Sequence, residues 1–250
     1  MPARMLVLGL TTATPRGGVA IVDGDRVLAR AVYVELRSHA EKLFAGIDEV
    51  CARAGVERAQ LVGVACDIGP GSFTGVRVGV SAATGIALAL RIPAIGVLSL
   101  EALATAALED IGVAAYVVVA IDAQKSETYL GRYRALSGGE VEQEEEPVVV
   151  SHERAKELLA EAKSRGDVVA GAAAAQLGVE PTRRSDALDF PDAGVIARIA
   201  ARRLALEPTA GRIDRTNATS PTLVPVYVRP PDITMPRAGG VQGPPPDRTE

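Results

Sequence analysis

The residues best suited to bind a ligand lie in a glycine-rich loop, DIGPGSFTGVRVG, at 67–79. Gly69 and Gly71 permit the backbone angles of a tight turn, and Ser72 is placed to cap the helix that follows. A helix that begins behind glycines presents free N–H groups and the positive end of its dipole, an arrangement that binds phosphate in many proteins. The residues that would contact an anion or a nucleotide are Gly69, Gly71, Ser72 and Thr74.

The loop has a second interpretation, as a tight connection between a strand and a helix. No lysine follows the glycines as in a Walker loop, and the spacing differs from the GxGxxG dinucleotide fingerprint. The pattern alone leaves both interpretations open.

Metal binding has little support among the side chains. The two histidines of the chain, His39 and His152, are far apart in sequence and fall in different halves. Cys51 and Cys66 fall in a predicted helix and a predicted strand, where a buried, unpaired cysteine is the usual interpretation. We therefore predict no metal site and no disulfide, which favours a reducing compartment.

Composition and charge narrow the class of protein. The chain has 250 residues, of which 48% are hydrophobic, enough for one large domain or two lobes. A net charge of −4 and a pI of about 5.4 are unfavourable for binding nucleic acid without a partner. The N-terminal apolar run is too short for a secretory signal, and no later stretch reaches membrane-spanning length without interruption. These features predict a soluble cytoplasmic protein.

Two similar series of strands and helices position these residues. In the first half, periodicity predicts strands over 5–10, 18–22, 26–34 and 61–66, with helices over 38–54 and 73–90. In the second half, it predicts strands over 115–122, 127–136, 141–150 and 167–171, with helices over 151–163 and 193–207. The repetition predicts a two-lobed α/β protein.

We place the first lobe at 1–104, the second at 105–215 and a C-terminal segment at 216–250. The end of that segment is rich in proline and glycine, which is typical of a flexible tail. The pattern leaves open whether the helix 193–207 packs back on the first lobe. It assigns no role to the tail or to the acidic stretch 140–146.

A stripe of small residues runs along the helix after the glycine loop. Gly75, Gly79, Ala83 and Ala87 recur every four residues and so share one face. Glycine costs about 1 kcal/mol in a helix interior, so the stripe needs a packing reason. It packs either on the sheet of its own lobe or against a helix of a partner.

Four segments together resemble the TsaB (YeaZ) family. They are GPGSFTGVRVG in the loop, RSHAEKLFAGIDEV before it, VAIDAQKSETYLGRY in the second half and PVYVR near the end. The resemblance spans residues 5 to 230. It implies an actin-like, sugar-kinase and Hsp70-type (ASKHA) fold with a mixed sheet and helices in each lobe. It also implies a non-catalytic subunit of the bacterial machinery that makes threonylcarbamoyladenosine in tRNA.

The same resemblance implies partners. The chain would pair with a TsaD-type catalytic subunit and support threonylcarbamoyl transfer to the adenosine next to the anticodon, in tRNAs that read codons starting with A. A TsaE-type ATPase belongs to the same complex, tRNA is reached only through the complex, and ATP and metal are expected on the partner subunits. We expect no membrane association. The sequence leaves open whether the free chain is a monomer or a homodimer. The expected interface residues are His39, Leu43, Ile47, Val50, Gly75, Gly79 and Ala83.

Two departures favour a role without catalysis. Ser99 and Leu103 stand where the catalytic paralogue has the histidines of an HxxxH metal motif. Thr11 stands where the first strand of relatives has an aspartate, and threonine cannot hold Mg²⁺ as a carboxylate does. A nucleotide-binding kinase or ATPase of the same fold is the alternative. A glycoprotease-like peptidase is weaker, because the chain has no GxSxG elbow. We expect no catalytic residue, no cofactor of its own and no activity of the chain alone.

Overall fold

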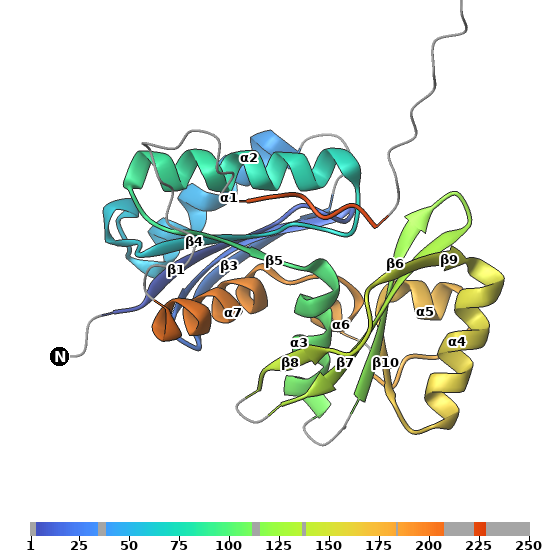
Figure 1. Ribbon diagram of the computed structural model, residues 1–250. Helices are drawn as coiled ribbons and strands as arrows, with labels where there is room; N and C mark the ends of the chain where they lie inside the picture. The colour runs from blue at the N-terminus through green and yellow to red at the C-terminus, as the bar shows by residue number, and fades with distance from the viewer. Residues whose placement is uncertain are drawn as a thin grey trace, which may run out of the picture.

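The computed structural model describes residues 4–34, 39–111, 116–136, 139–183, 185–207 and 223–228. These residues form two sheets, each with its own helices, in two lobes (Figure 1). The two-lobed α/β organisation predicted from the sequence is confirmed.

The first lobe is built on a five-stranded sheet of order β3-β2-β1-β4-β5. The strands are β1 (Leu6–Thr11), β2 (Arg16–Asp23), β3 (Arg26–Val34), β4 (Gly63–Asp67) and β5 (Ala94–Val97). β1 pairs antiparallel with β2 and parallel with β4. Every residue of β1 and β4 is buried, as expected for central strands that are covered on both faces.

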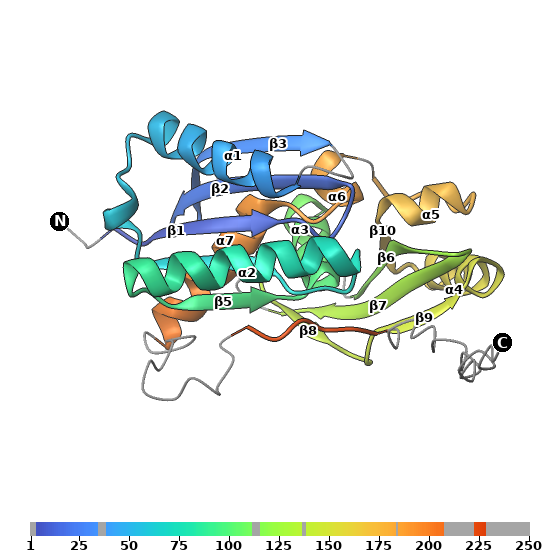
Figure 2. The same ribbon diagram turned by 90° about the horizontal axis from the view of Figure 1, so that it is seen from above.

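Helices cover both faces of this sheet. α1 (His39–Ala54) and α2 (Phe73–Leu90) lie over one face, with α1 on β2 and β3 and α2 on β4 (Figure 2). α7 (Ala193–Leu206) packs on β1, β2 and β4 from the other face. The helix predicted over 193–207 therefore returns to the first lobe, although it follows the second lobe in sequence.

The second lobe is built on a sheet of order β10-β6-β7-β8, with β9 also paired to β7. The strands are β6 (Tyr116–Gln124), β7 (Glu127–Ala135), β8 (Val141–Gln143), β9 (Val148–Ser151) and β10 (Val168–Ala170). α4 (His152–Ser164) and α5 (Ala172–Gln176) pack on one face of it. α3 (Ser99–Ile111) and α6 (Asp186–Asp189) lie on the other face, which points toward α7.

The structure differs from the sequence expectation in several segments, including the short helices α5 and α6, which were not predicted. Residues 141–150 form two strands instead of one, because the chain breaks between Gln143 and Val148, and β8 and β9 then pair with different parts of β7. β5 and α3 were not predicted, since a four-residue strand followed by an alanine-rich helix shows no clear periodicity. The predicted lobe boundary at residue 105 falls inside α3.

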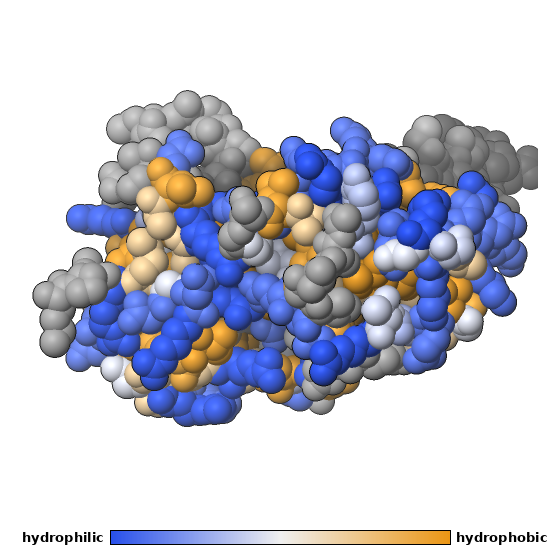
Figure 3. All heavy atoms as spheres, turned by 90° about the horizontal axis from the view of Figure 1, so that it is seen from below, coloured by the Kyte–Doolittle hydropathy of each residue, from blue (hydrophilic) through white to orange (hydrophobic). Residues whose placement is uncertain are grey.

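Ion pairs join the lobes on the face opposite α1 and α2. Arg203 of α7 pairs with Glu101 of α3, and both Arg198 and Arg202 of α7 pair with Glu109. Hydrophilic residues are spread over this side of the molecule, between smaller groups of apolar ones (Figure 3). The arginines of α7 and the glutamates of α3 therefore connect the two lobes on this side of the molecule.

Candidate functional site

The glycine loop is fixed to the end of the first strand. Ser72 caps α2 as predicted, since its Oγ accepts a hydrogen bond from the Gly75 N–H at 3.2 Å. The Ser72 N–H donates to the carbonyl oxygen of Ala13 at 2.7 Å. Gly69 has a φ of +100°, and a Cβ at Gly71 would lie 2.3 Å from the Ala13 carbonyl oxygen. The two glycines thus serve a tight turn and a close approach of two backbones.

The small-residue stripe of α2 receives the turn that follows β1. A Cβ at Gly75 would lie 2.0 Å from the carbonyl oxygen of Thr12, and one at Gly79 would lie 2.4 Å from the Thr12 Oγ1. The Thr12 hydroxyl donates to the Gly75 carbonyl oxygen at 2.8 Å. The small residues of the stripe are therefore needed so that the turn after β1, in the same lobe, can pack against α2.

This placement changes the expected interface. Six of the seven residues assigned to it are buried within the first lobe: Leu43, Ile47, Val50, Gly75, Gly79 and Ala83. They pack between the two helices and the sheet, so a partner could not contact them without unpacking the core. The side chain of His39 lies outside the described residues. An interface on α1 and α2 must use the outward side chains instead.

The outward side of α2 is exposed and carries two large apolar side chains. Only 28% of the residues of this helix are buried. By length and composition alone the helix could cross a membrane, which differs from the expectation that no stretch does so. Phe73 and Leu88 are 43% and 42% exposed, and Phe44 of the neighbouring α1 is 52% exposed. We call these outward side chains of α1 and α2 the helix face. Because α2 packs on β4 through its other side, the helix face is available to a protein partner.

Asp67, at the end of β4, is the charged residue whose role the sequence did not reveal. Its carboxylate is fully buried and accepts hydrogen bonds from the Thr11 hydroxyl at 2.7 Å, the Thr12 N–H at 3.0 Å and the Ala13 N–H at 3.1 Å. An acidic residue directly after the buried run LVGVAC was the available signal. Asp67 and α2 therefore hold the turn after β1 from two sides.

These contacts leave Asp67 unsuited to hold a metal ion. Three donors occupy its oxygens, and no part of the side chain reaches solvent. Ser99 and Leu103 are also fully buried. In the described part of the chain, no three His, Cys, Asp or Glu side chains are close enough to form a metal site. The residues at the ends of β1 and β4 thus do not fit a magnesium nucleotide.

Burial of Asp67 predicts a pH dependence of stability. Desolvation raises the pKa of this carboxyl above its ordinary value of 3.8, although the hydrogen bonds oppose the shift. The folded protein then binds the proton more tightly than the unfolded chain does. This residue therefore adds stability as pH falls through its raised pKa, and the gain is complete below 3.8.

Asp67→Asn should remove the stability that Asp67 adds at low pH. We expect the free energy of unfolding of the native protein, relative to that of the variant, to rise as the pH is lowered from 7 to 4. Denaturant unfolding at several pH values measures it, and the other carboxyl groups cancel in the comparison. Parallel curves for the two proteins would contradict the prediction.

A cleft of about 690 Å³ lies between the lobes, beside the N-terminus of α2. Gly71, Ser72 and Thr74 line it, whereas Gly69 lies beneath the carbonyl oxygen of Val226. Among the described residues, the lining of the cleft includes two carboxylates and neither Lys nor Arg. An anionic ligand would therefore meet the helix N-terminus but no cationic side chain from the lining.

Asp122 lies on the cleft wall and shapes the hairpin between β6 and β7. Its Oδ1 accepts the Gln124 N–H at 2.9 Å, and its side chain remains 42% exposed. Three consecutive residues of this hairpin, Gln124, Lys125 and Ser126, have positive φ angles. The aspartate thus acts as a turn former, as its position at a strand end indicates.

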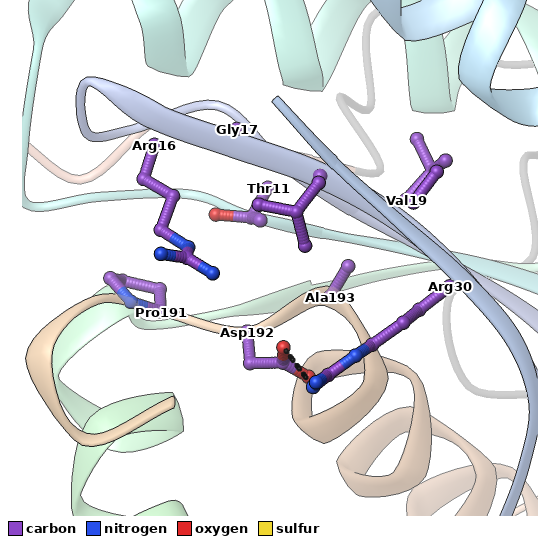
Figure 4. A pocket seen from close by; sticks show the side chains of 11 residues that line it. Thr11, Arg16, Gly17, Val19, Arg30, Pro191, Asp192 and Ala193 are labelled. Atoms are coloured by element: carbon purple, nitrogen blue, oxygen red, sulfur yellow. Dashed lines mark hydrogen bonds and ion pairs between the residues drawn. The ribbon is translucent and has the colours of Figure 1, made fainter. Parts of the chain in front are cut away.

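A second cavity, beneath the end of β1, is too small for a nucleotide. Its volume is about 10 Å³, room for about one water molecule. Figure 4 shows Arg30 reaching from β3 to Asp192 at the start of α7, with a nitrogen to oxygen distance of 3.3 Å. Thr11 and Arg16 lie on the opposite side of the same cavity. We therefore take the cleft between the lobes as the candidate ligand site.

Comparisons with known proteins agree with the resemblance seen in the sequence. Residues 27–202 match a family model described as TsaD: tRNA N6-adenosine threonylcarbamoyltransferase. The tRNA threonylcarbamoyladenosine biosynthesis protein TsaB of Escherichia coli (strain K12) is 34% identical over 163 residues, which are 63% of this chain and 69% of that protein. The protein of the same name from Haemophilus influenzae is 36% identical over 129 residues, which are 51% of this chain and 53% of that protein.

A solved structure covers more of the chain. YeaZ from Pseudomonas aeruginosa matches with a TM-score of 0.70 and 28% sequence identity, over 89% of this chain and 99% of that chain. The ASKHA fold implied by the resemblance is confirmed. The curated sequences are matched over only 53% and 69% of their own lengths, so the match to this structure is the more complete one.

Proposed function

This chain belongs to the TsaB (YeaZ) family, and on that premise we propose that it is a non-catalytic subunit in the synthesis of threonylcarbamoyladenosine in tRNA. In this proposal it pairs with a TsaD-type catalytic subunit. The pair supports threonylcarbamoyl transfer to the adenosine next to the anticodon, in tRNAs that read codons starting with A. The names of the curated relatives support the pathway.

The helix face is the observation that carries the pairing. α2 is an apolar helix of 18 residues, of which 28% are buried, and a second exposed aromatic, Phe44, lies on the neighbouring helix. Apolar surface of this kind on a folded protein is typical of a site that binds another protein. Helices of a paralogous subunit would offer a similar face. The same face would support a homodimer of the chain alone.

The buried polar residues support a role without catalysis. Ser99 and Leu103 occupy the positions of the metal-binding histidines of the catalytic paralogue, and Asp67 is enclosed by hydrogen bonds. In the proposed complex, the catalytic subunit provides the metal and a TsaE-type subunit hydrolyses ATP. The chain contacts tRNA only as part of that complex, in keeping with its net charge of −4.

A reconstitution tests this proposal. The catalytic subunit, the ATPase subunit, threonylcarbamoyl-adenylate and unmodified tRNA are mixed with and without this chain, and modified adenosine is counted by mass spectrometry. We expect modification only when the chain is present, and no ATP hydrolysis by the chain alone. Equal modification in its absence, or ATP turnover by the isolated chain, would overturn the proposal.

A further inference from the structure

Aromatic side chains are concentrated in the cleft between the lobes. The chain has five Tyr, three Phe and no Trp. Four of these eight aromatic residues line the cleft: Phe73, Tyr129, Phe190 and Tyr227. They come from both lobes and from the segment 223–228. A cavity of about 690 Å³ with such a lining has the size and the apolar character of a binding site.

The charges of the cleft restrict its occupant. Asp122 and Asp189 line it, and among the described residues its lining includes neither Lys nor Arg, while Arg77 contacts the lining residues Phe73 and Tyr227 from outside. The Asp122 carboxylate accepts hydrogen bonds from Gln124 and lies 4.0 Å from the His152 Nε2, and its side chain remains 42% exposed, so a further cation can approach it from solvent. A neutral or basic occupant therefore fits this cleft better than a phosphorylated one does.

The chain itself leads into this cleft. Val226 and Tyr227 line it, and the Val226 N–H donates to the carbonyl oxygen of Ile68 at 2.7 Å, which anchors the segment beside the glycine loop. Tyr227 also contacts Phe73, with 5.2 Å between ring centroids, and accepts a hydrogen bond from Arg77. The described part of this segment therefore ends at Val228, one residue after the cleft-lining Tyr227.

The residues that follow have the composition that an aromatic groove binds. The segment 229–246, RPPDITMPRAGGVQGPPP, contains six prolines, two arginines and one aspartate, and it lies outside the described residues. Aromatic-lined grooves recognise proline-rich segments, because such segments lose little entropy on binding. Its two arginines complement the carboxylates of the cleft.

We propose that the segment 229–246 is an intramolecular ligand of the cleft. Its prolines stack on the aromatic side chains, and an arginine pairs with Asp122. Attachment at Val228 gives the segment an effective concentration of about millimolar, so a weak intrinsic affinity is sufficient. This inference is independent of the proposed function, because it concerns the isolated chain.

Disulfide trapping in the full chain tests the proposal. Gln176→Cys places a thiol on the exposed side of α5 at the cleft, and Ala238→Cys places one within the segment. The native Cys51 and Cys66 are buried and do not compete. The matched control replaces Gln176→Cys with Glu161→Cys, an exposed position on α4 that does not line the cleft.

Under mild oxidation at low protein concentration, we expect the cleft pair to form an intramolecular disulfide about tenfold faster than the control pair, because binding raises the local concentration of the two thiols. Equal rates would overturn the proposal. A disulfide between two chains would also overturn it, since the occupant would then be the segment of a second copy.

A second measurement uses hydrogen exchange. Replacing Pro230, Pro231 and Pro236 with Ser in the full chain should increase amide exchange in residues 71–74, at the start of α2, by at least about threefold, because the bound segment no longer protects them. Exchange in β1 serves as the reference that this change should not alter. Unchanged exchange in the cleft residues would contradict the proposal.

Discussion

Leu88→Glu is expected to abolish binding of the TsaD-type subunit and to leave the fold of this chain intact. Leu88 lies on the helix face and is 42% exposed, so a carboxylate there remains in water in the free chain. In the proposed apolar interface, the same carboxylate would be buried without a partner. Burying an unpaired charge costs several kcal/mol, so we expect the dissociation constant to rise at least about 100-fold.

Leu136→Glu is the matched control for this variant. Leu136 is 39% exposed and follows β7 in the second lobe, away from the helix face. Titration calorimetry with the catalytic subunit measures both affinities, and the melting temperatures of both variants should equal that of the native chain. If Leu88→Glu binds as tightly as Leu136→Glu does, the interface lies elsewhere and the pairing through α1 and α2 is refuted.

Much of the fold could be predicted from local patterns. The hairpin at Gly24, the cap at Ser72 and the buried strands follow from turn chemistry and periodicity, which act within a few residues. The burial of Cys51 and Cys66 was also predicted correctly. The packing of α7 on the first sheet could not be predicted, because the apolar face of a helix does not by itself specify which of the two sheets it covers.

The site was harder to predict because its residues are far apart in the sequence and come together only in the folded chain. The stripe of Gly75 and Gly79 was visible, but the sequence could not show that the backbone of Thr12 fills it. The role of Asp67 likewise depends on the parallel pairing of β4 with β1, which brings the carboxylate to the Thr11 hydroxyl. The glycine loop therefore has a clear structural reason, the close packing of the β1 turn.

The close packing of the β1 turn on α2 predicts that alanine substitution at two glycines of this helix has opposite effects on stability. At Gly75, a Cβ would lie 2.0 Å from the Thr12 carbonyl oxygen, so Gly75→Ala must displace backbone in the core. We expect it to destabilise the fold by roughly 3 kcal/mol. At Gly85, a Cβ would meet nothing within 4 Å, so Gly85→Ala should stabilise the fold by about 1 kcal/mol through helix propensity.

Thermal unfolding distinguishes the two variants. For a domain of this size, the expected change in melting temperature is a fall of roughly 6–12 °C for Gly75→Ala and a rise of roughly 2–4 °C for Gly85→Ala. Gly85 is the matched control, because it has the same helix and the same substitution without the contact. If both variants were stabilised equally, the Thr12 turn would not pack on α2, and the stripe would again be available to a partner.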